Sequence, residues 1–269
     1  MADGPRGLLV GSLCGLARAL ERGATASTYV AAGLLRWDAL GRHMAENWRQ
    51  FGLTQTEPDV ADGLFPWEKD FYGRFMTPGE RILVVGCGGG RDLVPLLEQG
   101  YRVEGLEPVA ACARMASERL AARGLTAEIH VADIATAALP GPYDVMIFSW
   151  FCYSYLPLRA RRVAVLRRTR EHLAGGGRIL ISYVLAPPVV RRLPWRLARL
   201  AAQLSRSDWR PEPGDAFMAR ADTGCIHYEH RFRPEEIEAE AREAGLAVAF
   251  HEHDSDGNLA LRVPGAGGQ

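Results

Sequence analysis

The glycine-rich segment of residues 81–92, RILVVGCGGGRD, has the residue types and spacing of a ligand-binding loop. Its apolar start predicts a strand. Gly86, Gly88 and Gly90 then let the backbone approach a ligand closely, with amide groups pointing outward before the next helix. Such a loop suits an anionic or adenosine-bearing molecule. The dinucleotide fingerprint requires GxGxxG, whereas Arg91 occupies the position of its last glycine, so the spacing argues against a nicotinamide dinucleotide.

Two acidic residues follow later apolar runs. Glu107 closes the second predicted strand, where a carboxylate can accept hydrogen bonds from both hydroxyls of a ribose. Asp133 lies in the segment VADI, after the third predicted strand. Alone, Glu107 is typical of a solvated turn and Asp133 of a helix or turn cap. The distance of Glu107 from the glycine loop favours the ribose-binding interpretation.

Aromatic residues are dense at two places where a pocket is expected. They could shape an apolar or aromatic acceptor site and face a cation, although core or lid packing is the alternative for each. Tyr72 and Tyr155 are the best candidates for lining the ligand. The two groups are Trp150, Phe151, Tyr153 and Tyr155, and Phe65, Trp67, Phe71 and Tyr72.

The segment CIHYEHRF, residues 225–232, contains His227 and His230. Imidazole titrates near neutral pH, so each histidine is a candidate general base, with Tyr155 as a further candidate. Their opposite parity prevents one extended strand from directing both toward a single site. A surface or structurally hydrogen-bonded histidine is the alternative for each.

From Arg81 onward, short apolar runs alternate with segments of helical period. This is the pattern of βαβ units and indicates an α/β fold. Gly100 and Gly124 stand where helices end, and Pro108 where a helix begins. The predicted strands are 81–85, 101–106, 127–131, 144–150, 178–184, 246–252 and 258–263, and the predicted helices are 91–99, 108–123 and 159–173.

Two regions lie outside this alternation. Residues 1–78 show helical spacing, with a stop expected at Gly23, and form a predicted N-terminal lid. Residues 79–269 form the predicted main domain, in which the alternation lapses at about 185–232 and indicates an inserted cap. The basic apolar helix 193–206 within it favours a lid over a membrane-surface segment.

Five elements in this order resemble class I S-adenosylmethionine-dependent methyltransferases. They are the glycine loop, Glu107, VADI with Asp133, the strand YDVMIFSW from Tyr143, and HLAGGGRILISY at 172–183. The resemblance implies a Rossmann-like, seven-stranded, mostly parallel sheet flanked by helices, with the last strand antiparallel. It also implies a ligand over the carboxyl ends of the first, second and fourth strands.

The resemblance also implies roles for individual residues. The acid at Glu107 would bind the ribose, and Asp133 with Ile134 would flank the adenine. The glycine loop would lie against the methionine part, and the residues after the fourth strand would border the methyl group. The residues implied at the cofactor are Gly86, Cys87, Gly88, Glu107, Pro108, Asp133, Ile134, Ser149, Trp150 and Tyr72, and those at the substrate are Phe151, Tyr153 and Tyr155.

One position departs from the family pattern. An acid often stands two residues before the first glycine, and this chain has Val84 there. The ammonium group of the cofactor must therefore find other acceptors. Backbone carbonyls near Gly86 or Ser149 could serve.

Methyl transfer from a sulfonium draws its driving force from the cofactor, so the protein mainly supplies orientation and a dry site. No metal is required, and a base helps only where the acceptor holds its proton. We expect an O, N or S atom of a small molecule as the acceptor and S-adenosylhomocysteine as the product.

Composition narrows the partners and the location. Basic and acidic residues number 32 each, so the chain has no net positive charge that would attract nucleic acid. The five cysteines form no CxxC pair, so neither a disulfide framework nor a zinc site is indicated and a cytoplasmic protein is expected. The apolar stretch 7–20 is interrupted by Ser12 and Arg18 and is shorter than a membrane span, so no stable membrane insertion is expected. The oligomeric state stays open.

Two alternatives also stay open. One is an NAD-dependent oxidoreductase on the same fold, which Arg91 disfavours. The other is a catalytically silent S-adenosylmethionine-binding scaffold or regulatory protein, suggested by Val84 and by the lack of an evident base.

Overall fold

The computed structural model describes residues 5–54, 63–188, 192–220, 223–254 and 256–265. The chain divides into two compact units, and two of the three boundaries fall within a helix and a strand. This grouping differs from the predicted division into 1–78 and 79–269, because the first helix packs against the insertion. The first unit comprises Met1–Met44 and Val189–Tyr228, and the second comprises Ala45–Pro188 and Glu229–Gln269.

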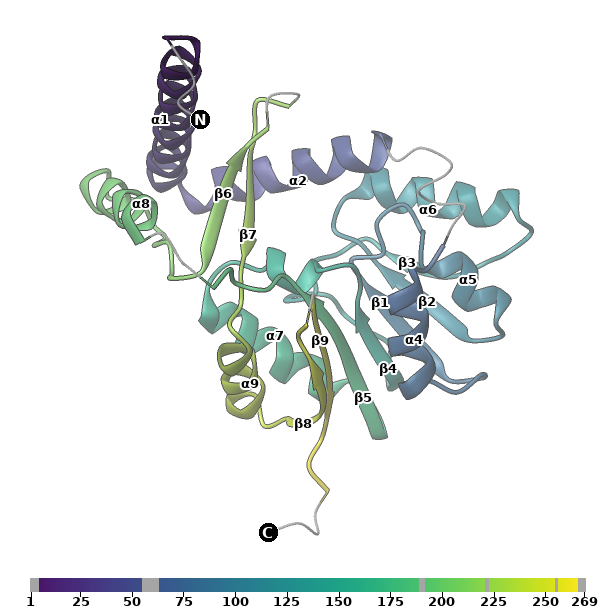
Figure 1. Ribbon diagram of the computed structural model, residues 1–269. Helices are drawn as coiled ribbons and strands as arrows, with labels where there is room; N and C mark the ends of the chain where they lie inside the picture. Colours follow the sequence, from purple (N-terminus) through teal and green to yellow (C-terminus); the bar gives the residue numbers. More distant parts are fainter. Residues whose placement is uncertain (1–4, 55–62, 189–191, 221–222, 255, 266–269) are drawn as a thin grey trace. The chain divides into compact units, whose positions relative to one another are not determined.

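The second unit contains a seven-stranded sheet in the order β3-β2-β1-β4-β5-β9-β8 (Figure 1). Neighbouring strands from β3 to β5 are parallel, whereas β9 runs antiparallel to both β5 and β8. The predicted mostly parallel sheet with an antiparallel last strand is confirmed. The strands are β1 Arg81–Val85, β2 Arg102–Leu106, β3 Ile129–His130, β4 Tyr143–Phe148, β5 Leu173–Tyr183, β8 Ala247–Glu252 and β9 Gly257–Arg262.

Helices cover both faces of this sheet (Figure 1). Alternate residues of β1 separate the two cores: Ile82 and Val84 face α4, α5 and α6, and Leu83 and Val85 face α7 and α9. This alternation follows from the period of two along a strand. The helices are α4 Pro66–Phe75, α5 Leu93–Glu98, α6 Ala110–Ala122, α7 Arg159–Glu171 and α9 Pro234–Glu243.

The fourth strand ends earlier than predicted. β4 stops at Phe148, and the predicted strand extended to residue 150. Trp150 and Phe151 have positive φ values of 34° and 64°, which no strand can accommodate. The chain therefore turns sharply at the carboxyl edge of the sheet before the short 3-10 helix η1, Cys152–Tyr155.

The first unit is built from helices and a two-stranded sheet. The helix α1 runs through the predicted stop at Gly23, so that prediction is wrong; Gly23 has a right-handed helical backbone. No helix in the described ranges has the length and apolar content needed to cross a membrane. The elements are α1 Pro5–Leu34, the start of α2 Trp37–Thr54, α8 Arg192–Leu204, β6 Asp215–Ala219 and β7 Ile226–His230.

Small residues allow α1 and α8 to approach closely. Ala32, Ala198 and Ala202 are buried, and a Cβ placed on Gly33 would lie 2.1 Å from the Ala198 carbonyl oxygen. Backbone atoms cannot move aside as a flexible side chain can, so a methyl group at this position must separate the helices.

We expect Gly33→Ala to lower the free energy of unfolding by about 1–3 kcal/mol through this clash. Gly23→Ala is the matched control in the same helix, because a Cβ there has nothing within 4 Å. Helix propensity predicts that the control gains up to about 1 kcal/mol. Chemical denaturation of both variants measures the difference. Equal stability of the two variants would contradict the packing described for α1 and α8.

Candidate active site

The glycine loop lies at the carboxyl edge of the sheet, between the ends of β2 and β4. Val85, the last residue of β1, pairs with both Leu106 and Phe148. Gly86 has a φ of +72°, and a Cβ there would lie 2.9 Å from that of Cys152. Gly88 has a φ of +52° and an open position where a side chain would be. The backbone is therefore exposed to an approaching ligand at Gly88.

Glu107 is anchored at the end of β2. Its Oε2 accepts a hydrogen bond from the Gly88 amide at 2.9 Å, and its Oε1 accepts one from the Val109 amide at 2.8 Å. The residue is 6% exposed, and burial raises the pKa of its carboxyl group while the two amides oppose that rise. Each carboxylate oxygen can accept a second hydrogen bond. Glu107 is thus fixed in place with acceptor capacity remaining.

The residues predicted beside the adenine lie after β3. Asp133 accepts hydrogen bonds from the Ala135 amide at 2.8 Å and from Arg161 at 2.5 Å, so the capping interpretation describes its observed contacts. Ile134 is buried in the core that faces α7, and Pro108 is exposed. An adenine-binding role for Asp133 and Ile134, and cofactor binding by Pro108, stay predictions.

Ser149 and two aromatic residues form the turn after β4. The buried Ser149 hydroxyl donates to the Asp92 carboxylate. The Trp150 ring lies 5.9 Å from that of Phe65, and the Phe151 ring stacks on Trp67 at 6.0 Å. The two aromatic groups predicted from the sequence therefore meet at this turn.

A buried ionic cluster lies beside the turn and was not predicted. Arg91 binds both carboxylate oxygens of Glu68, at 2.7 and 2.6 Å, and its Nη2 lies 2.6 Å from Oδ1 of Asp92. Its guanidinium also lies 4.6 Å from the Phe65 ring centroid and 5.2 Å from that of Trp150. Arg91 therefore links α4, the glycine loop and the turn after β4.

Comparison with known proteins agrees with this geometry. A family model described as a methyltransferase domain matches residues 68–250, which include the glycine loop, Glu107, the turn after β4 and the whole insertion. The chain belongs to the class I S-adenosylmethionine-dependent methyltransferases.

Individual relatives of this methyltransferase align over part of their length. The chain is 36% identical over 115 residues to protein-L-isoaspartate O-methyltransferase from Methylorubrum populi, covering 42% of this chain and 48% of that protein. It is 31% identical over 196 residues to nocamycin O-methyltransferase from Saccharothrix syringae, covering 70% and 66%. The chain thus spans about half of the first relative and just under two thirds of the second.

A solved structure shows the same fold. The S-adenosylmethionine-dependent methyltransferase from Methanosarcina mazei superposes with a TM-score of 0.60 at 16% identity, covering 74% of this chain and 98% of that protein. The predicted Rossmann-like methyltransferase fold is confirmed.

The glycine loop and its neighbours fit the cofactor of this methyltransferase. The open position at Gly88 leaves room for a ligand against the backbone, and Glu107 retains acceptor capacity beside it. The hydroxyl of Tyr72, on α4, has no hydrogen-bond partner in the described part of the chain although the residue is only 3% exposed. A buried hydroxyl without a partner is costly, so a ligand group would satisfy it. The placement of Tyr72 at the cofactor stays a prediction.

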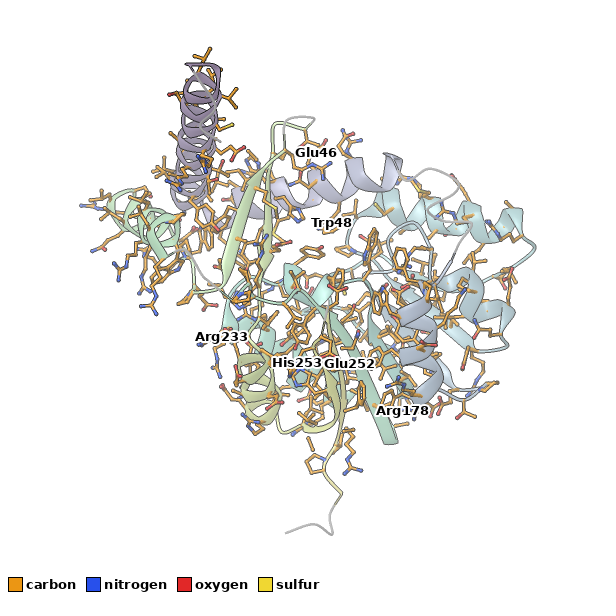
Figure 2. All side chains as sticks on the ribbon, viewed as in Figure 1. Glu46, Trp48, Arg178, Arg233, Glu252 and His253 are labelled. Atoms are coloured by element: carbon orange, nitrogen blue, oxygen red, sulfur yellow. The ribbon has the colours of Figure 1, made fainter. Side chains whose placement is uncertain are left out.

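Trp48 was not among the predicted site residues. It comes from the C-terminal part of α2 (Figure 2), and its ring centroid lies 4.5 Å from that of Tyr155. Its backbone carbonyl accepts from the Cys112 thiol at 3.5 Å. Burial raises the pKa of Tyr155, which disfavours its phenolate as a base. The sequence around Trp48 shows only the apolar spacing of a helix, which does not indicate a site residue.

Two predicted site residues of this methyltransferase lie inside the core. Tyr153 is fully buried, stacks on Phe232 and donates its hydroxyl to Glu240 at 2.9 Å. His230 is also fully buried, with Nε2 3.2 Å from a Glu236 oxygen. The substrate-pocket prediction for Tyr153 and the base prediction for His230 are corrected, because both polar groups are committed to internal partners away from solvent.

His227 belongs to the first unit. It lies on β7 and is half-buried. A role for His227 as a general base stays a prediction.

Three side chains of types that can bind a metal ion lie together near the edge of the sheet. The ligand atoms of Glu104, Glu128 and His130 lie within 4.8 Å of one another. Glu104 also pairs with Arg81 at 2.7 Å and accepts from the Tyr143 hydroxyl at 2.8 Å. These bonds give Glu104 a structural role, so we interpret the group as an ion-pair cluster.

Proposed function

We propose that this protein transfers the methyl group of S-adenosylmethionine to an oxygen atom of a small-molecule acceptor. The observation that carries the proposal is Glu107, held by two backbone amides next to the open face of Gly88. The name of the Saccharothrix relative, an O-methyltransferase aligned over 70% of the chain, supports oxygen as the acceptor atom. The isoaspartate enzyme aligns over only 42%.

The protein's own residues would bind and orient the cofactor and exclude water from the site. Glu107 would hold the ribose hydroxyls, and the backbone from Gly86 to Gly88 would lie against the methionine part. When bound, the cofactor supplies an electrophilic methyl group on a sulfonium. The Trp150 and Phe151 side chains, packed on Phe65 and Trp67, would provide a dry surface beside it.

The turn after β4 favours an acceptor that loses its proton readily. Its Ser149 hydroxyl is committed to Asp92, and its next two side chains are Trp150 and Phe151. A phenol, enol or carboxylic acid supplies its own nucleophilic oxyanion, whereas an aliphatic alcohol requires a base. We therefore propose a planar, acidic hydroxyl compound. A cytoplasmic location stays a prediction.

A panel of acceptors tests the proposal by measuring S-adenosylhomocysteine formed with phenols, enols, carboxylic acids, sugar alcohols and an isoaspartyl peptide. Turnover of an acidic hydroxyl compound and none of the peptide is expected. Turnover of the peptide alone would overturn the substrate class. Cofactor binding with no turnover of any acceptor would favour the silent scaffold. In a thermal melt, protection by NAD but not by S-adenosylmethionine would favour the oxidoreductase.

A further inference from the structure

The ionic cluster beside the glycine loop buries more negative than positive charge. Glu68 is 0%, Asp92 2% and Arg91 5% exposed. Within the described residues, the ion pairs of this cluster join two carboxylates to a single guanidinium. One negative charge is thus left over in a site from which solvent is largely excluded.

An excess buried charge is costly unless a further partner compensates it. Burial raises the pKa of Glu68, and the Asp92 charge adds to the rise, while hydrogen bonds from Arg91 oppose it. Oδ1 of Asp92 lies near Arg91 but accepts no hydrogen bond within the described part of the chain. The protein alone therefore leaves this carboxylate incompletely satisfied.

The excess charge lies where the methionine part of the cofactor is proposed. Asp92 accepts from Ser149, whose amide lies 3.3 Å from the Val85 carbonyl at the end of β1. Asp92 directly precedes α5, yet its side chain makes no capping hydrogen bond. Its carboxylate is thus not used to begin the helix.

Tyr72 supplies a second polar group, a buried hydroxyl that has no hydrogen-bond partner in the described part of the chain. It lies in the same core cluster as Val84, the position where related methyltransferases often carry an acid. Burial raises the pKa of the Tyr72 hydroxyl, and the charge of Asp92 adds to that rise. Within the described residues, Oδ1 of Asp92 has an ion pair with Arg91 but no hydrogen bond, and the Tyr72 hydroxyl has no hydrogen bond either. Both groups accompany the missing acid at Val84.

We propose that Asp92 binds the α-ammonium group of the cofactor, with the Tyr72 hydroxyl as a second contact, and so replaces the acid that the chain lacks at Val84. The bidentate Glu68–Arg91 pair holds Asp92 in position. The inference rests on the proposed function, since it assumes that S-adenosylmethionine binds at the glycine loop.

Calorimetric titration of Asp92→Asn with three ligands tests this inference. S-adenosylmethionine and S-adenosylhomocysteine both carry the ammonium group, so both should bind at least tenfold more weakly. 5′-Methylthioadenosine lacks the amino-acid part and should bind as it does to the natural protein. The ligand-free variant should melt at the same or a higher temperature, because it loses a poorly compensated buried charge. A purely structural role would lower that temperature.

Matched variants complete the test. Glu98→Gln, which changes an exposed acid at the far end of α5, should change no affinity. Tyr72→Phe should weaken the first two ligands but not the third, and it replaces Asp92→Asn if that variant fails to fold. Unchanged binding of the first two ligands, equal weakening of all three, or weakening of S-adenosylmethionine alone would overturn the inference. If the natural protein binds none of the ligands, the proposed function itself fails.

Discussion

Glu107→Ala is expected to weaken the binding of S-adenosylmethionine by about 2–4 kcal/mol, roughly 30- to 700-fold in the dissociation constant. In the proposed site, the variant would lose two charge-assisted hydrogen bonds from the ribose hydroxyls to the Glu107 carboxylate. It also frees the Gly88 amide, which Glu107 holds at 2.9 Å, so the glycine loop loses an internal support.

Calorimetric titration measures this effect, and Glu118→Ala on the exposed face of α6 is the control. Unlike Asp92→Asn, the Glu107 variant should also bind 5′-methylthioadenosine more weakly, because that ligand keeps the ribose. The two variants thus separate the ribose end of the site from the methionine end. An unchanged dissociation constant would show that the ribose binds elsewhere.

Glu240→Ala is expected to lower the free energy of unfolding by about 3–5 kcal/mol. Glu240 on α9 and Arg162 on α7 are both fully buried, and Arg162 Nη2 lies 2.7 Å from Oε1 of Glu240. Removing the carboxylate leaves a buried guanidinium without its principal partner and the Tyr153 hydroxyl without its acceptor. Both losses act on the same core.

Chemical denaturation measures this change, and the same helix offers a matched control. Glu243 pairs with Arg159 at 2.6 Å, but both side chains are 43% exposed. Exposed pairs contribute little, so Glu243→Ala should cost less than about 1 kcal/mol. A similar loss in both variants would mean that the Arg162–Glu240 pair does not depend on burial for its effect.

The elements of the sheet could be predicted because each carries a local signal. The short apolar run of residues 82–85, closed by Gly86, predicted β1 at its observed limits. Proline and glycine placed the helix from residue 108 to 123 within two residues of α6. The wrong end of β4 has a backbone cause, since the sequence of Trp150 and Phe151 does not reveal their left-handed conformation.

The ionic cluster and the α1–α8 pairing had no such signal. Glu68 and Arg91 are far apart in the chain, and Arg91 was informative only as a departure from a glycine fingerprint. Tyr153 and Tyr155 are two residues apart with the same residue type, yet one is in the core and the other contacts Trp48. Tertiary packing decides such cases, and neither composition nor periodicity reports it.

The position of β9 between β5 and β8 has a consequence for how the sheet forms. β5 can pair with β9, its antiparallel neighbour, only when the chain between them closes into a loop. That loop includes the whole insertion. The entropy of closing a loop grows only slowly with its length, so this loop can lengthen or shorten at little thermodynamic cost. Non-local pairing instead slows folding. The fold can therefore exchange its insertion during evolution while keeping its sheet, and its folding rate is more sensitive than its stability to that exchange.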